Sequence, residues 1–251
     1  MPNGILARMA RFDFEDTFGE DYLYFYADFL SDEHNDADVD AIVAALDLQG
    51  NERILDAPCG HGRISNRLAE RGMSVVGVDA TQLFLDRASD GGDSVEYVHG
   101  DMRSLPVDGP FDVALSWFTS FGYFDDDDNQ RVLAEYRRVL RPGGRLLMEL
   151  HNHDEFVRRF TPAPFSSTTR VGDDVMIDTS EFDCETGRVE TDRVTIRGGR
   201  LRESHHSVRF PTIPELRAWL IDAGFSDVTF SARDGKPPSI HRSRLVVVAT
   251  A

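Results

Sequence analysis

The chain has 251 residues, 41% hydrophobic and 28% charged, which is typical of a globular protein with one large α/β domain or two small ones. Its formal net charge of -17 at pH 7 would repel DNA or RNA at long range, which argues against a nucleic-acid substrate. No apolar stretch approaches the roughly 20 residues that span a bilayer and no secretory hydrophobic region is present, so we expect a cytoplasmic protein without a membrane partner.

The first 50 residues predict a helical head. The stretch DTFGEDYLYFYADFL is rich in aromatic residues, and ADVDAIVAALDL has the spacing of an amphipathic helix. This head is expected to pack across the carboxyl edge of a sheet as a lid, although a role in the core would explain the aromatic residues about equally well.

Residues 51–160 predict the core of a parallel sheet, because short apolar runs alternate with helical patterns. The predicted strands are 53–55, 74–78, 95–99, 111–116 and 145–150. Gly72 is expected to end the first helix between them, and Pro142-Gly143-Gly144 the last. The helices follow from apolar residues at helical spacing: Ile64 and Leu68; Leu83, Leu85 and Ala88; and Val132, Leu133, Tyr136, Val139 and Leu140.

Residues 161–210 predict an inserted antiparallel meander. The runs VMIDTSEF, RVETDRVTIR and LRESHHSVRF are strand-like, and glycine-containing turns separate them. Residues 211–251 then predict a helix, PELRAWLIDAG, and two strands that return to the main sheet, FSDVTFSA and SRLVVVAT. The whole chain is therefore expected to form a single domain, and an exposed edge of the meander could pair in a homodimer.

The segment ILDAPCGHGRISNRLA places a glycine-rich bend between a strand and a helix. Gly60 and Gly62 let the main chain approach a ligand closely, and free N–H groups at the start of the helix attract negative charge. The bend could hold the pyrophosphate of a dinucleotide or the carboxylate end of an amino-acid-like cofactor. The carboxylate of Asp56 favours a cationic group there, such as an ammonium or a sulfonium.

Polar residues at further strand ends predict a shared cleft, because ligands of open parallel sheets bind beyond the carboxyl ends of the strands. Asp79 could accept hydrogen bonds from ribose hydroxyls, and Asp101 could accept one from an amine such as that of adenine, with Met102 against the ring. A single aspartate could also be a helix cap or a turn former. Three of them at three successive strand ends indicate one binding site.

With this glycine-rich bend and these aspartates at the strand ends, the sequence resembles the class I S-adenosylmethionine-dependent methyltransferases. Five segments match the motifs of that family in order: ILDAPCGHG, VVGVDAT, VHGDM, FDVALSWFTSFGYF and VLRPGGRLLMEL. His61 and Arg63 depart from the family pattern, in which small residues or threonine are common. The resemblance implies an α/β fold with a Rossmann-like seven-stranded, mainly parallel sheet, an antiparallel last strand and S-adenosyl-L-methionine as cofactor. It implies cofactor contacts from Asp56, Ala57, Gly60, Gly62, Asp79, Ala80, Asp101, Met102 and Ser116.

The residues after the fourth strand indicate which class of molecule receives the methyl group, called the acceptor. Ser116-Trp117-Phe118-Thr119 lacks the Asn/Asp-Pro-Pro-aromatic motif of nucleic-acid amino-group methyltransferases and the two glutamates of arginine methyltransferases. The aromatic head and the meander resemble small-molecule methyltransferases, including N-methyltransferases of amino sugars and of glycine. A small organic acceptor is therefore expected, with N or O slightly favoured as the accepting atom. The residues expected to wall its pocket, each of which could instead be a core residue, are Tyr24, Tyr26, Trp117, Phe118 and Tyr123.

Methyl transfer needs mainly alignment and exclusion of water, and it needs a base only when the nucleophile starts protonated. His151 and His153 follow the fifth strand and are the candidate bases, although they could also be solvated loop residues beside Asp154. Tyr22 could cover the sulfonium or steer the substrate, or it could pack in the core.

No metal site is predicted. Cys59 and Cys184 are expected to be reduced, and no Cys–His cluster has the spacing of a zinc site. The run Asp125-Asp126-Asp127-Asp128 is expected to cap a helix rather than bind an ion. His205 and His206 share a predicted strand, so their rings should point to opposite faces.

Two alternative functions are consistent with parts of the sequence. A nicotinamide-dependent oxidoreductase would need a third glycine where Ser65 stands and would have no use for Asp56. A protein that binds S-adenosylmethionine only as a scaffold, or to steer a different reaction, would carry the same five motifs.

Overall fold

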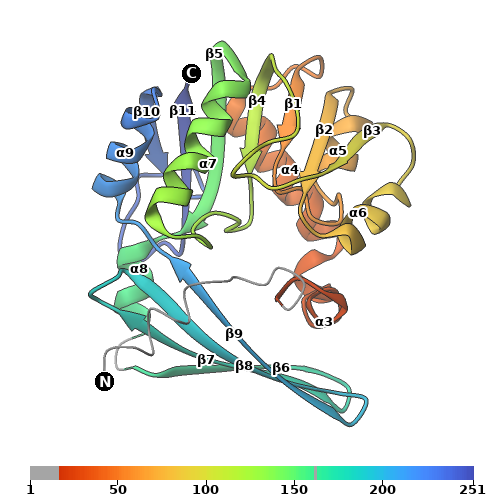
Figure 1. Ribbon diagram of the computed structural model, residues 1–251, viewed down its shortest axis with the longest axis vertical. Coiled ribbons are helices and arrows are strands. Elements are labelled where there is room, and N and C mark those ends of the chain that lie inside the picture. Colours follow the sequence, from red (N-terminus) through yellow and green to blue (C-terminus); the bar gives the residue numbers. More distant parts are fainter. Residues whose placement is uncertain (1–16, 161–162) are drawn as a thin grey trace.

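The computed structural model describes residues 17–160 and 163–251, which form two separate β-sheets (Figure 1). The larger sheet has seven strands, and the smaller sheet has four and lies beyond the carboxyl ends of the parallel strands. Residues 1–16 of the predicted head and 161–162 of the predicted insertion lie outside the described residues. No helix in the two described stretches is long and apolar enough to span a bilayer.

The seven-stranded sheet has the expected, mainly parallel architecture. Its strand order is β10-β11-β5-β4-β1-β2-β3, so the direction of chain winding reverses between β1 and β4. Strand β11 runs antiparallel to both of its neighbours, as the family resemblance implied. The strands are β1 (Arg53–Asp56), β2 (Ser74–Asp79), β3 (Val95–His99), β4 (Phe111–Ser116), β5 (Leu140–His151), β10 (Ser226–Ser231) and β11 (Arg244–Thr250).

Strand β5 begins earlier than the sequence pattern predicted. Leu140, expected as the last apolar residue of a helix, is instead extended (φ -79°, ψ 141°) and pairs with Phe111 of β4. The preceding helix, α7 (Asp126–Val139), ends one residue before it. Gly143 and Gly144 were expected only to end the preceding helix. Instead, the N–H of Gly143 donates to the carbonyl of Ala251, so the pairing between β5 and the end of the chain continues across these glycines.

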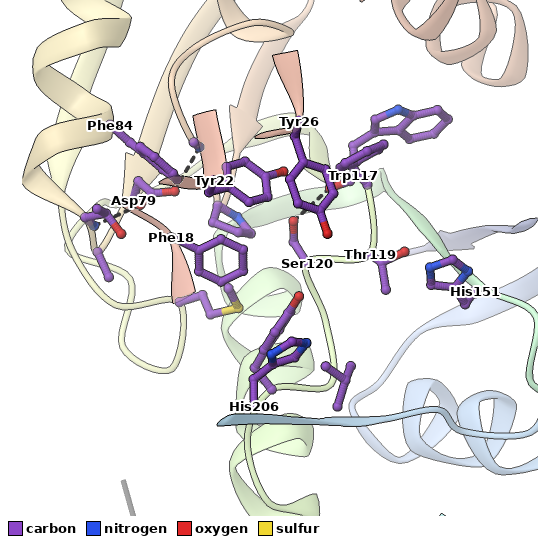
Figure 2. A pocket seen from close by; sticks show the side chains of 18 of the residues that line it. Phe18, Tyr22, Tyr26, Asp79, Phe84, Trp117, Thr119, Ser120, His151 and His206 are labelled. Carbon is purple, nitrogen blue, oxygen red and sulfur yellow. Dashed lines mark hydrogen bonds between the residues drawn. The ribbon is translucent and has the colours of Figure 1, made fainter. Parts of the chain in front are cut away.

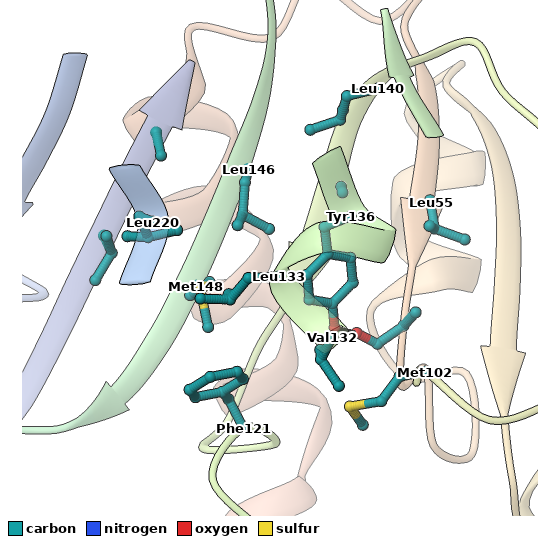
Figure 3. Packing of buried hydrophobic residues seen from close by; sticks show 14 of the residues in the cluster. Leu55, Met102, Phe121, Val132, Leu133, Tyr136, Leu140, Leu146, Met148 and Leu220 are labelled. Atoms are coloured by element: carbon teal, nitrogen blue, oxygen red, sulfur yellow. Dashed lines mark hydrogen bonds between the residues drawn. The ribbon is translucent and has the colours of Figure 1, made fainter. Parts of the chain in front are cut away.

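Helices cover both faces of this sheet. Helices α4 (Asp32–Leu46) and α5 (Ser65–Glu70) pack on one face, whereas α7 and α9 (Ile213–Asp222) pack on the other (Figure 1). Side chains alternate along each strand, so neighbouring apolar residues enter opposite layers, which explains the continuous apolar runs. Figure 3 shows one such layer, in which Leu133, Tyr136 and Leu220 pack among strand residues. Full burial of one leucine contributes about 1.5–3 kcal/mol.

Two details of the helices can be compared with the predictions made from the sequence. In α6 (Gln82–Ser89) the buried side chains are Phe84, Leu85 and Ala88, whereas Leu83, which the helical spacing of apolar residues had singled out, is only half-buried. Asp125 caps α7 as expected, because its carboxylate accepts a hydrogen bond from the N–H of Asp128 at 2.8 Å.

The smaller sheet is an antiparallel meander in the order β6-β7-β8-β9. Its strands are β6 (Phe165–Val171), β7 (Asp174–Asp183), β8 (Arg188–Arg197) and β9 (Arg200–Arg209). Strand β6 was not predicted, because FSSTTRV is mostly polar and becomes a strand only by pairing along β7. The short helix α8 (His153–Arg159) precedes the meander, and α3 (Glu20–Phe25) with the 3₁₀ turn η1 (Ala27–Leu30) forms the described part of the head before α4.

The meander is attached to the loop that follows β4, residues 117–124, which we call the β4 loop. The buried guanidinium of Arg188 donates to the carbonyls of Phe124 at 2.9 Å and Gly122 at 3.3 Å, and also to Ser207 on β9. The N–H of Arg209 donates to the same Gly122 carbonyl at 2.7 Å. These contacts hold the β4 loop in one position relative to the four-stranded sheet.

Candidate cofactor and acceptor site

A cavity of about 390 Å³ lies between the carboxyl ends of the main strands, the head and the meander. Asp56 of β1, Asp79 of β2 and Asp101, which follows β3, all line it, as the cleft predicted from the strand ends requires. Figure 2 shows Asp79 and Phe84 at one end of the labelled side chains, with Thr119 and His151 at the other end.

The glycine-rich bend and Asp79 are joined by hydrogen bonds. The N–H of Gly60 donates to one oxygen of Asp79 at 2.8 Å, and the N–H of Thr81 donates to the other oxygen at 2.8 Å. Burial raises the pKa of Asp79, and these two hydrogen bonds counteract the rise. The side chain of Thr81 also hydrogen-bonds Asp79. A carboxylate has about four acceptor positions, so Asp79 can accept a further hydrogen bond from a ligand hydroxyl.

Gly60 has a backbone conformation that favours glycine. Its φ is +55°, and a Cβ atom placed on it would have Phe84 as its nearest neighbour at 4.0 Å. Both residues line the cavity, so the main chain is open to a ligand at this position. Gly62 differs, because a Cβ atom there would lie 2.4 Å from the hydroxyl of Tyr97. Its role in the structure is to allow close packing.

Asp56 lies deeper, at the end of β1. Only 2% of the residue is exposed, and the hydroxyl of Ser65 donates to its carboxylate at 2.6 Å. Burial raises the pKa of Asp56 to about 7. The carboxylate is therefore close to its titration midpoint near neutral pH, and a cation bound beside it would favour the ionised form.

Asp101 and Met102 form a third part of the lining. The side chain of Arg103 donates to both carboxylate oxygens of Asp101, at distances from 2.6 to 3.1 Å. Burial acts to raise the pKa of Asp101, but the hydrogen bonds from Arg103 outweigh it and the pKa is lowered. Arg103 also binds Asp128 at 2.8 Å, which connects this loop to α7.

Five of the residues predicted for the site do not line the cavity: Ala57, Gly62, Ser116, Tyr24 and His153. Ala57 is buried, with its carbonyl accepting a hydrogen bond from Tyr136 in the core, and Ser116 is also fully buried. The hydroxyl of Tyr24 donates to Asp174 on the meander at 2.9 Å, and the ring of His153 is hydrogen-bonded to Asp154 at 2.8 Å. Their side chains face other parts of the fold, which sequence spacing does not reveal.

The head contributes aromatic rings to the cavity. Tyr22 stacks on Tyr26 with ring centroids 4.6 Å apart, and Phe18 makes edge contacts at 5.4 Å with both Tyr22 and Tyr123. Burial raises the pKa of Tyr22, so its hydroxyl stays protonated at neutral pH. The described part of the head therefore supplies part of the cavity lining.

The meander contributes polar side chains that sequence reasoning did not select. Asp178, Thr191, Arg193 and His206 all line the cavity. Arg193 donates to both oxygens of Asp178, at 2.7 and 2.8 Å, and to the hydroxyl of Tyr26 at 3.1 Å. These residues lie two apart on their strands or opposite one another, so their side chains share one face of the meander. The alternation of side chains along a strand predicts such a shared face, but it does not reveal which face of the meander is turned toward the cavity.

The two adjacent histidines of β9 face in opposite directions, as predicted. His206 lines the cavity, and burial lowers its pKa to about 4. The ring of His205 is hydrogen-bonded to Asp192 at 2.8 Å and to Glu190 at 3.0 Å.

The β4 loop carries two consecutive non-glycine residues with positive φ, Phe118 at 64° and Thr119 at 57°. Such conformations cost on the order of 1–3 kcal/mol each and are often found at functional sites. The guanidinium groups of Arg63 and Arg244 lie 4.9 and 5.2 Å from the ring centroid of Phe118, and Arg244 donates to the hydroxyl of Thr119 at 2.7 Å. Both arginines line the cavity.

His151, at the end of β5, is the candidate base that reaches the cavity. Its ring stacks on Phe210 with a centroid distance of 5.3 Å. Burial, together with the nearby positive charge of Arg244, lowers the pKa of His151 to about 3. The imidazole is therefore neutral at pH 7 and has a nitrogen that can accept a hydrogen bond.

Comparison with known proteins identifies the family of this site. Residues 54–144 match the family model described as a methyltransferase domain. The cypemycin N-terminal methyltransferase of a Streptomyces species is 30% identical over 78% of this chain and 81% of its own length. The demethylmenaquinone methyltransferase of Paenarthrobacter aurescens strain TC1 is 26% identical over 81% of this chain and 74% of its own length.

A solved structure shares the fold over nearly the whole chain. The CcbJ methyltransferase of Streptomyces caelestis superposes with a TM-score of 0.78 at 20% identity, covering 96% of this chain and 99% of that protein. Together with the five sequence motifs and the sheet order, these matches exclude the nicotinamide-dependent oxidoreductase. The chain belongs to the class I S-adenosylmethionine-dependent methyltransferases.

Proposed function

We propose that the protein methylates a small organic acceptor that binds in the cavity between the head, the β4 loop and the meander, and that the whole chain acts as one catalytic domain. The observation that carries this proposal is the lining of the cavity. One end has carboxylates suited to a nucleoside, and the other has aromatic and polar side chains from four different parts of the chain. A cavity of about 390 Å³ falls within the usual range for small-molecule sites.

The described residues fit S-adenosylmethionine. Asp79 lines the cavity and would accept a hydrogen bond from a ribose hydroxyl, and Asp101 with Met102 would contact the adenine. Gly60 would lie along the methionyl part, because it leaves the main chain open to the cavity. Asp56 would favour the positively charged groups of the cofactor. When bound, the cofactor supplies a methyl group activated by its attachment to a sulfonium.

The side chains of the protein would align the acceptor and exclude water. In the reaction, a bond forms between the acceptor atom and the methyl carbon while the carbon–sulfur bond breaks, leaving S-adenosylhomocysteine. A hydroxyl acceptor would give up its proton as the new bond forms. Neutral His151 would accept a hydrogen bond from that hydroxyl and orient it, but its pKa of about 3 makes it a weak base for the proton. A neutral amine needs no base before transfer. Relatives named as N-methyltransferases support nitrogen as the acceptor atom.

The test is methyl transfer from labelled S-adenosylmethionine to a panel of small amines and alcohols, with S-adenosylhomocysteine formation as a second readout. We expect a labelled product from at least one compound and none from DNA or RNA. Binding of the cofactor without any product from this panel or from fractionated small-molecule extracts would support the scaffold alternative instead.

Substitution of the two candidate bases should separate their roles. His151→Ala is expected to lower turnover while leaving cofactor affinity unchanged, because His151 lines the cavity. His153→Ala is the matched control, because His153 is bound to Asp154 outside the cavity. Turnover and cofactor binding should be measured for both variants. Full activity of both would show that the nucleophile needs no histidine.

Cofactor affinity should depend on pH through Asp56. Its pKa of about 7 means that the carboxylate is mostly protonated at pH 6 and mostly ionised at pH 8. A cationic ligand binds the ionised form, so the affinity for S-adenosylmethionine should increase about 10-fold between about pH 6 and pH 8. Titration calorimetry at several pH values measures this change. Asp56→Asn should have a much flatter profile, and an equally steep profile in that variant would assign the titration to another group.

A further inference from the structure

Resting on the proposed function, we propose that the acceptor carries a carboxylate, and that the guanidinium of Arg244 binds it. Arg244 begins β11 and pairs in the ladder with His151, at the carboxyl end of β5. Its side chain lines the cavity and is 23% exposed. Arg244 lies at the end of the cavity proposed for the acceptor, because its neighbours Thr119 and His151 lie at the opposite end from Asp79 (Figure 2).

Arg244 differs from the other two arginines that line the cavity. Arg63 donates to Asp38 at 2.7 Å, and Arg193 donates to Asp178 at 2.7 Å, so each of them has a close carboxylate. For Arg244, the nearest carboxylate oxygen in the described part of the chain belongs to Glu149, at 3.8 Å, which is too far for a hydrogen bond.

The carboxylates near Arg244 are shared with other guanidinium groups. Glu149 is fully buried and has Arg233 at 3.6 Å as well as Arg244 at 3.8 Å, so two guanidinium groups share one carboxylate. Arg233 also pairs with Asp38, which is the partner of Arg63. Asp56 also interacts electrostatically with Arg63, so Arg244 is the one guanidinium of this cluster that has no carboxylate within hydrogen-bond distance among the described residues.

The remaining contacts hold Arg244 in a fixed orientation. Only its Nη1 atom has a hydrogen-bond partner among the described residues, the hydroxyl of Thr119 at 2.7 Å, and the guanidinium lies against the ring of Phe118. Its Nε and Nη2 atoms are left to donate. A planar guanidinium with free donors suits two-point binding of a carboxylate, and a partly buried cation without a close partner gains most from an anionic ligand.

The separation of charges within the cavity agrees with this assignment. Asp56, next to the glycine-rich bend, would favour the cationic cofactor, whereas Arg244 beside His151 would favour an anion. A carboxylate at Arg244 would fix one end of the acceptor and leave its other end directed into the cavity.

The experiment uses matched ligands in the presence of S-adenosylhomocysteine. Binding of glycine, β-alanine and anthranilate would be measured by ligand-observed NMR and compared with binding of the three corresponding amides. We expect at least one acid to bind more tightly than its amide. Arg244→Met should weaken binding of that acid by about 10- to 100-fold, the range expected for a charged hydrogen-bonded pair, and should leave the amide unaffected.

Arg145→Met is the matched control, because Arg145 lies at the other end of the same β5–β11 ladder, opposite Thr250. This variant should bind the acid normally. Thr119→Val removes the hydroxyl that orients Arg244 and should give a smaller loss, so the proposal can be tested even if Arg244→Met folds poorly. Equal binding of acids and amides, no binding of any acid, or unchanged binding of the acid by Arg244→Met would overturn the proposal.

Calorimetry with S-adenosylhomocysteine separates this proposal from the proposed function. Wild type and Arg244→Met should bind it equally, because the residues proposed for the cofactor lie at the other end of the cavity. Cofactor binding together with methyl transfer only to neutral acceptors would overturn the carboxylate inference and leave the proposed function standing. Cofactor binding with no transfer to any acceptor would count against the proposed function itself.

Discussion

Asp79→Ala is expected to weaken binding of S-adenosylhomocysteine about 5- to 150-fold, equivalent to about 1 to 3 kcal/mol. The carboxylate of Asp79 is held by the N–H groups of Gly60 and Thr81 and lines the cavity, where it would accept a hydrogen bond from the ribose. Removing it takes away charge-assisted hydrogen bonds and also releases the bend that carries Gly60. Titration calorimetry measures the effect.

Two further variants make this result specific. Asp79→Asn keeps the shape of the side chain and one carbonyl oxygen, so it should lose less affinity than alanine. Asp90→Ala removes an exposed carboxylate just after α6 and should bind normally. An unchanged dissociation constant for Asp79→Ala would show that the ribose binds elsewhere.

Gly122→Ala is expected to lower the free energy of unfolding by about 2–5 kcal/mol. Gly122 has a φ of +105°, and an added Cβ would lie 2.3 Å from the backbone carbonyl oxygen of Arg209. Two backbone segments would have to separate, which would move the β4 loop away from the meander. Denaturant unfolding measures the stability, and the Michaelis constant of the acceptor should rise as well.

Gly172→Ala is the control for the backbone conformation alone. Gly172 also has a positive φ, +60°, but an added Cβ would meet nothing within 4 Å. We expect this variant to lose only about 1 kcal/mol, the cost of the left-handed conformation in a residue with a side chain. Similar losses in both variants would mean that the contact with Arg209 has no special importance.

The parts of the site that could be predicted from sequence are those fixed by local order along the chain. Asp56, Asp79 and Asp101 follow apolar runs, and parallel strands bring their carboxyl ends to one edge, so their convergence follows from strand prediction alone. His205 and His206 could likewise be assigned to opposite faces, because alternation along a strand needs no knowledge of tertiary packing.

The parts that could not be predicted depend on contacts between segments far apart in sequence. Arg193 and Asp178 enter the cavity because the meander folds back over the main sheet, and the sequence does not indicate which face of the meander is turned inward. Gly62 fits the ligand-binding motif, but the neighbouring Tyr97 decides its role. Leu140 continues the apolar spacing of a helix, yet pairing with Phe111 makes it part of a strand.

The contacts that anchor the meander through Gly122 and Phe124 leave the side chains in the cavity free to change during evolution. Arg188 and the N–H of Arg209 donate to the main-chain carbonyls of Gly122 and Phe124, and the guanidinium of Arg209 pairs with Asp126 and Glu215. None of these partners lines the cavity. Inward-facing side chains such as Thr191 and His206 can therefore be exchanged without removing an anchoring atom. The atoms that contact the acceptor and the atoms that anchor the meander are thus different. Substitutions in the cavity can therefore change which acceptor is bound while the fold stays intact.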